Sequence, residues 1–297
     1  MIIATQMMTG AVAAAEDCAG FGTQPYFAEV TVEALAQCLN AGSDLSQRDA
    51  AGNTPLHNAL VAARNPGLVR LLLRADAPPD ARRRDGRTPL HLLAEMGSFP
   101  GMVSLLVLAG ADVNATIEGR DASFWSFADP RGTTALHLAA RRDDAPGMIT
   151  ALLAARADPD RRTAEGRTAL HVAARYSTTP GIVEMLLAAG ADPDAEDDRD
   201  LTPLHQAAAW NPAPAIAAAL LAAGADADEP SAQGETPLHY AARASEAQPV
   251  LDMLLSAAQD PCRRDEGDTT ALALAGRNAA LRDTPAYWRL HERCYGK

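Results

Sequence analysis

A four-residue motif recurs at a nearly constant interval along this chain of 297 residues. The motif is Thr, then Pro or Ala, then Leu and His, and its copies begin at Thr54, Thr88, Thr134, Thr168, Thr202 and Thr236. A decayed copy, Thr-Ala-Leu-Ala, begins at Thr270. The interval is 34 residues, except between the second and third copies, where it is 46. One unit of this length cannot bury its hydrophobic face alone, so the period predicts units that stack on one another.

Each repeat predicts two short helices joined by a loop. The motif threonine suits the N-cap of the first helix, the next proline suits position N1, and the leucine begins an apolar face. A second proline follows 12 residues after the threonine in five of the six copies and suits the start of a second helix. These second prolines are Pro66, Pro100, Pro146, Pro180 and Pro214.

Glycines mark the ends of the repeats. The second helix runs into Ala-Gly-Ala-Asp at Gly110, Gly190 and Gly224, where glycine adopts the left-handed conformation at little cost. Asp76, Arg156 and Ala258 replace this glycine in other copies, so we expect those turns to be strained or closed differently. A second glycine-containing turn, called here the finger, leads to the next motif, and Asp200 breaks its pattern.

The order helix, loop, helix and β-turn resembles the ankyrin repeat, and the motifs above carry the resemblance. It implies an all-α fold, an ankyrin-repeat solenoid of helix-loop-helix-β-turn units with capping repeats at both ends. We expect one domain over residues 16–297, with an N-terminal cap at about 20–50 and a C-terminal cap at 270–297. The usual ankyrin period is about 33 residues, and the additional residue here lies in the loop between the helices. This variant and the Ala- and Arg-rich composition resemble bacterial ankyrin proteins.

The charge of the chain argues against two kinds of partner. The net charge is −12, and Lys297 is the single lysine. An acidic protein repels nucleic acid phosphates and anionic lipid. We therefore expect no nucleic acid partner, and we expect no membrane insertion because the apolar N-terminal segment is too short and too interrupted.

The four cysteines lie near the two ends of the chain. Cys18 and Cys38 precede the first repeat, and Cys262 and Cys294 flank the last. This placement predicts one disulfide in each cap, while four buried thiols remain the alternative. Disulfides would indicate a periplasmic or secreted protein rather than a cytoplasmic one. Residues 1–15 resemble a signal peptide that lacks a basic start, and the alternative is a disordered tail.

The sequence contains no pattern typical of catalysis. Six of the seven histidines are motif residues, which in ankyrin repeats make local hydrogen bonds between neighbouring repeats. Nucleophile elbows, phosphate-binding loops and metal-ligand spacings are missing, and His291 with Cys294 does not form one. We predict no catalytic residue, no cofactor and no metal site, and therefore not an enzyme.

The first helices instead offer residues suited to binding a protein. The position after each motif histidine holds Asn58, Leu92, Leu138, Val172, Gln206 and Tyr240, and we expect it to face the concave surface. Three and four residues further lie large and charged side chains, a composition typical of binding hot spots. These residues are Arg141, Arg142, Arg175, Tyr176, Trp210 and Arg243. For Tyr176 and Trp210, the alternative is that they pack within the repeats.

An insertion of 12 residues enlarges the finger at about 116–130 and contains Phe124, Trp125 and Phe127. These rings either bind a partner or pack on the finger. The whole pattern predicts a monomeric, non-catalytic scaffold that binds another protein. The alternatives are an inhibitor or immunity-type protein that blocks one enzyme, and an accessory factor of an envelope enzyme.

Overall fold

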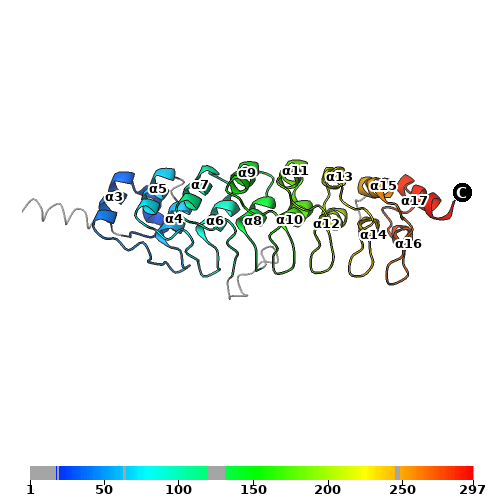
Figure 1. Cartoon of the computed structure of the whole chain (residues 1–297), viewed down its shortest axis with the longest axis horizontal. Coiled ribbons are helices and arrows are strands. Elements are labelled where there is room, and N and C mark those ends of the chain that lie inside the picture. The colour runs from blue at the N-terminus through cyan, green and yellow to red at the C-terminus, as the bar shows by residue number, and fades with distance from the viewer. Residues whose placement is uncertain (1–17, 19, 63–64, 119–130, 245–247, 297) are drawn as a thin grey trace, which may run out of the picture. The chain divides into compact units, whose positions relative to one another are not determined.

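The structure is a computed structural model that describes residues 18, 20–62, 65–118, 131–244 and 248–296 (Figure 1). These residues fall into two compact units. The first comprises the chain up to Leu138 together with Ala154–Ala157, and the second comprises Ala139–Leu153 and Asp158–Lys297. Helices α8 (Ala135–Ala140) and α9 (Pro146–Ala154) contain residues of both units.

The first unit contains three helix pairs. They are α2 (Gln24–Glu29) with α3 (Val32–Asn40), α4 (Pro55–Ala62) with α5 (Pro66–Arg74), and α6 (Pro89–Met96) with α7 (Gly101–Leu108). Within this unit α2, α4 and α6 pack in one row, and α3, α5 and α7 pack in a second row. The N-terminal cap is therefore itself a helix pair that continues both rows.

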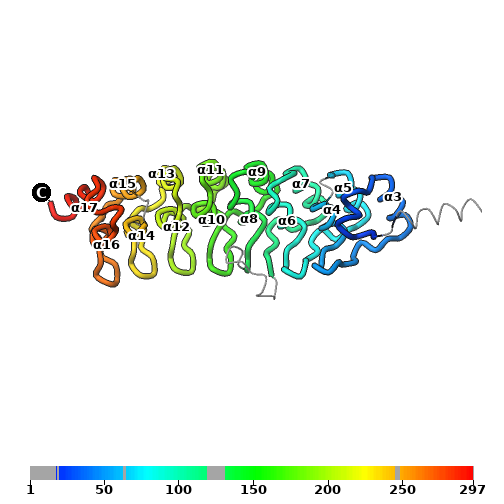
Figure 2. The backbone as a smooth tube through the Cα atoms, turned by 180° about the vertical axis from the view of Figure 1, so that it is seen from behind, coloured from blue at the N-terminus to red at the C-terminus, as the bar shows by residue number. Residues whose placement is uncertain are grey.

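The second unit repeats this arrangement over four pairs. They are α10 (Ala169–Tyr176) with α11 (Pro180–Ala188), α12 (Pro203–Trp210) with α13 (Pro214–Ala222), α14 (Pro237–Arg243) with α15 (Gln248–Ala257), and α16 (Ala271–Arg277) with α17 (Pro285–Tyr295). Here α10, α12, α14 and α16 form one row, and α11, α13, α15 and α17 form the other, as Figure 2 also shows from behind. In the described part of the chain the regular elements are helices, with one isolated β-bridge between Arg264 and Thr270.

The core lies between the two rows of helices. The leucines of the six full motifs are at most 1% exposed, for example Leu170 on α10, and Leu186 on the second helix α11 is as buried. Burying such a side chain stabilises the fold by about 1.5–3 kcal/mol. The predicted apolar face is therefore confirmed.

The turns after the second helices depend on left-handed residues. Gly110, Gly190 and Gly224 have φ values of 99°, 93° and 94°. Asp76 and Arg156 adopt the same conformation with φ values of 63° and 67°, at the steric cost expected for residues with a Cβ atom. Asp200 also has a positive φ of 55° in its finger. Ala258 keeps a negative φ, so its turn is closed differently.

Two backbone hydrogen bonds connect the segments on either side of the long finger. The Ile117 N–H donates to the Thr133 carbonyl over 2.9 Å, and the Gly132 N–H donates to the Ile117 carbonyl over 3.2 Å. Phe124, Trp125 and Phe127 lie outside the described residues.

Both caps carry a bonded cysteine pair. Cys18 joins Cys38 on α3, and Cys262, in the turn before α16, joins Cys294 on α17. The pairs are those predicted from the sequence, and such bonds are typical of oxidising compartments. Among the described helices, none has the length and apolarity needed to cross a membrane.

Candidate protein-binding surface

Five of the predicted binding residues lie on three successive first helices of the second unit. Arg175 and Tyr176 end α10, Trp210 ends α12, and Tyr240 and Arg243 lie on α14. Tyr176 and Trp210 are each 42% exposed. We call these five residues the Arg–aromatic surface.

Arg175 connects two repeats across this surface. Its guanidinium carbon lies 4.3 Å from the centre of the Trp210 ring and 5.4 Å from that of Tyr176. Its Nη1 donates to Oε1 of Gln206 over 3.3 Å. Each cation–π contact at an exposed site contributes about 0.5–1 kcal/mol, so the three side chains hold one another in place before any partner arrives.

The stack continues from α12 to α14. The Trp210 and Tyr240 rings lie 6.1 Å apart, and Tyr240 meets the buried His205 ring edge to face at 5.4 Å. Burial, with the charge of Glu235 as a second cause, raises the pKa of Tyr240, which stays neutral. Arg243 lies 5.8 Å from the Tyr240 ring and pairs with Glu235, whose hydrogen bond raises the pKa of Arg243.

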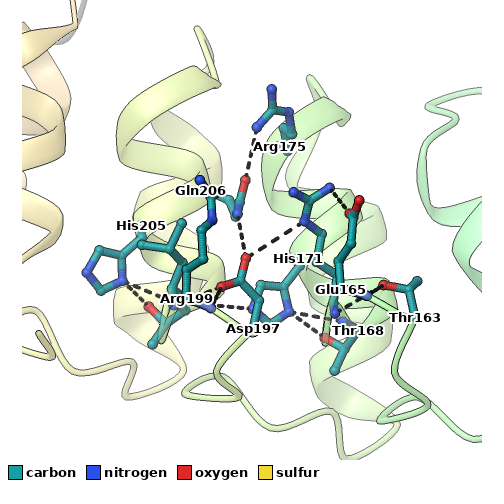
Figure 3. Close-up of polar contacts among 12 residues, drawn as sticks. Thr163, Glu165, Thr168, His171, Arg175, Asp197, Arg199, His205 and Gln206 are labelled. Carbon is teal, nitrogen blue, oxygen red and sulfur yellow. Dashed lines mark hydrogen bonds and ion pairs between the residues drawn. The ribbon is translucent and has the colours of Figure 1, made fainter. Parts of the chain in front are cut away.

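A buried carboxylate supports the surface from below (Figure 3). Asp197 is 3% exposed and accepts from the backbone N–H of Arg199 over 2.8 Å. It also accepts from Nε2 of Gln206 over 3.4 Å and lies 3.8 Å from Nε of Arg167. Gln206 thus has its amide nitrogen fixed by Asp197 and its amide oxygen directed to Arg175. Sequence reasoning placed Gln206 on the surface, but it is fully buried and acts as a support.

The motif histidines have a structural role. In His171, Nδ1 accepts from the Thr168 N–H over 3.1 Å, so the ring proton lies on Nε2, which donates to the Leu201 carbonyl over 2.8 Å. The same pattern ties His91, His205 and His239 to carbonyls of the following repeat. Burial is the main cause that lowers the pKa of His171 to about 4. The predicted hydrogen bonds between repeats are confirmed.

The loops between paired helices also form a chain of contacts. Ser177 Oγ donates to Asp143 over 2.6 Å, and Thr178 N–H donates to the same carboxylate over 2.9 Å. Asn211 Nδ2 in turn donates to the carbonyls of Ala174 and Ser177 over 2.7 and 2.8 Å. Asp143, Ser177 and Asn211 are spaced by 34 residues, a signal that the sequence contained and that our reasoning missed.

Other predicted binding residues lie elsewhere. Leu92 and Leu138 are 5% and 2% exposed, so they are core residues and not the surface residues we expected. Asn58 and Gln206, which occupy the same position of their repeats, are buried as well. Arg141 and Arg142 follow α8 and are half-buried, and Arg142 pairs with Asp144 over 2.7 Å. Among the described residues, no three His, Cys, Asp or Glu side chains are grouped so that they could hold a metal ion.

Stacked helix pairs joined by fingers define a repeat protein. A family model of ankyrin repeats matches three times, over residues 28–117, 118–197 and 177–265. The chain therefore belongs to the ankyrin-repeat family, whose members are generally protein-interaction scaffolds.

Solved structures support the same fold. The chain is similar to the crystal structure of the ankyrin repeat domain of Bcl-3, described as a unique member of the IkappaB protein family. The identity is 31% and the TM-score 0.64, over 78% of this chain and 97% of that one. No curated protein matches the sequence.

Proposed function

We propose that this protein is a non-catalytic, monomeric scaffold that holds another protein against the Arg–aromatic surface. The observation that carries the proposal is the exposure of Tyr176 and Trp210, at 42% each, beside a stacked arginine. Tyr, Trp and Arg are the residues that dominate binding hot spots. Their mutual stacking also reduces the side-chain entropy that binding would otherwise cost.

The setting we propose is periplasmic or secreted. The bonded pairs at Cys18–Cys38 and Cys262–Cys294 support this setting, since such bonds persist where thiols are not kept reduced. Both disulfides would then remain intact in the compartment where the protein binds its partner.

The proposal is tested by exchanging one exposed tryptophan at a time. Trp210→Ala removes the ring at the centre of the Arg–aromatic surface. Trp288→Ala is the matched control, because it removes a 53% exposed ring that lies on α17, outside this surface. Tagged wild type and both variants are used to co-purify proteins from extract of the cells that produce the chain. We expect one protein to be retained by wild type and by Trp288→Ala, with at least a tenfold loss for Trp210→Ala, about 1.4 kcal/mol.

Circular dichroism melting of both variants serves as the folding control. Equal recovery of every co-purifying protein by the two folded variants would remove the Arg–aromatic surface from the proposal. Binding that survives both changes would place the contact elsewhere on the chain.

A further inference from the structure

Arg175 differs in its partners from three other arginines of the second unit. Arg243 pairs with Glu235, Arg142 with Asp144, and Arg167 with Glu165 over 2.9 Å. Within the described chain, Arg175 contacts the neutral Gln206 and two aromatic rings, and no carboxylate. It is a fixed positive charge without a counter-ion, in a protein whose net charge is −12.

The surroundings of Arg175 determine which donors it can offer. A guanidinium has five N–H donors in one plane, and here one of them bonds to Gln206 while Trp210 covers a face of the plane. Gln206 is itself held by the buried Asp197, so the plane has a defined orientation. The remaining in-plane donors are suited to the two oxygens of a carboxylate, which guanidinium binds in a forked geometry.

The charge balance favours a carboxylate over a phosphate. Phosphate groups carry close to two negative charges and are typically bound by clusters of arginines. Arg175 is the described arginine that stacks on the Trp210 ring, whereas Arg167 and Arg199 both contact the buried Asp197 carboxylate, Arg199 through its backbone N–H. One positive charge matches one carboxylate. On either side, the exposed rings of Tyr176 and Trp210 offer apolar area next to the charge.

We infer that Arg175 is a specificity-determining residue that binds an aspartate or glutamate of the partner, with apolar side chains of the same segment resting on Tyr176 and Trp210. This inference rests on the proposed function and adds the chemistry of the segment that is recognised. The partner chemistry is thus an acidic side chain flanked by apolar ones.

The test uses the full-length protein and a phage-displayed library of random short peptides. We expect selection to enrich peptides with Asp or Glu beside a large apolar residue. One enriched peptide is then synthesised in two forms, with the acid and with the matching amide. Wild type should bind the acid form at least about tenfold more tightly, as expected for a charge-assisted hydrogen bond.

Variants connect this preference to Arg175. Arg175→Gln should remove the preference for the acid form and leave binding of the amide form within about twofold. Arg70→Gln, which changes an exposed arginine on α5 of the first unit, is the matched control and should keep the preference. Trp210→Ala should weaken both forms, because it removes apolar contact as well as the support of Arg175.

The outcomes separate the two levels of the proposal. Selected peptides that depend on Trp210 but show no acidic preference, or whose preference survives Arg175→Gln, would overturn the role of Arg175 and leave the surface intact. Peptides whose binding ignores Trp210→Ala, or a library that yields no binder, would count against the Arg–aromatic surface itself.

Discussion

Acidification should destabilise this protein through four buried histidines. His57, His91, His171 and His205 have pKa values lowered to about 4, and burial is the main cause for each. In the unfolded chain a histidine titrates near 6.5. Because the unfolded state binds more protons between these values, the histidine contribution is fully present above pH 6.5 and is lost as pH falls toward 4.

The magnitude follows from the two pKa values. At pH 5.5 an unfolded histidine is mostly protonated and a buried one is not, which costs roughly 1–1.5 kcal/mol of folding free energy for each ring. Four rings together cost about 4–6 kcal/mol, a large part of the 5–15 kcal/mol that stabilises a typical protein. His57 and His91 lie in the first unit, and His171 and His205 lie in the second, so both units should weaken.

The assay is urea unfolding followed by circular dichroism at pH 7.5 and pH 5.5. This window avoids most carboxylate titration. Burial alone would raise the pKa of Asp143, but the hydrogen bonds from Ser177 and Thr178 together lower this pKa below 3.8. His171→Gln should lower stability at pH 7.5 and remove about a quarter of the pH effect. Ile182→Val on α11 removes no proton-binding group and should keep the full effect. Unfolding free energies that stay constant between the two pH values would refute the reasoning.

Three further predictions concern the caps, loops and fingers. Replacing Cys262 and Cys294 with serine should lower the unfolding free energy by about 2–4 kcal/mol, and the denatured, unreduced wild type should titrate no thiols. Asn211→Ala removes both bonds to loop carbonyls and should cost about 1–3 kcal/mol in denaturant unfolding. Gly166→Ala should destabilise by more than about 1 kcal/mol, because φ is +75° and the new Cβ would lie 2.7 Å from a backbone nitrogen. Gly181→Ala, with open space around it, should cost nothing.

The helices could be predicted because their signals are local. Thr168 is the residue immediately before α10, and Pro180 is the first residue of α11. The capping histidine of α10 and the missing proline N–H of α11 each act within the first turn of the helix. Pro100 was a partial exception. We expected it to be the first helical residue, but α7 begins at Gly101, after Phe99 adopts a φ of 57°. A left-handed phenylalanine gives no signal in sequence.

The surface was less predictable because it depends on how neighbouring repeats face each other. The exposure of Tyr176 and Trp210 agrees with the prediction, but periodicity alone placed Leu92 and Leu138 on the same surface. A helix of two turns is too short for sequence periodicity to show which of its sides faces solvent. Contacts such as that of Arg175 with Gln206 join residues 31 positions apart and follow only from the packing of one repeat on the next.

The chain of contacts through Asp143, Ser177 and Asn211 has a consequence for how such an array can lengthen. If residues 168–201 were duplicated in tandem, the loop of the second copy would face the serine of the first instead of the Asp143 carboxylate. Its Thr178 N–H and hydroxyl would lose their acceptor, since the carboxylate comes from the preceding repeat. Repeats of this protein are therefore not interchangeable modules. Gene duplication should succeed more readily when it copies neighbours together, so that each loop inherits the acceptor it needs.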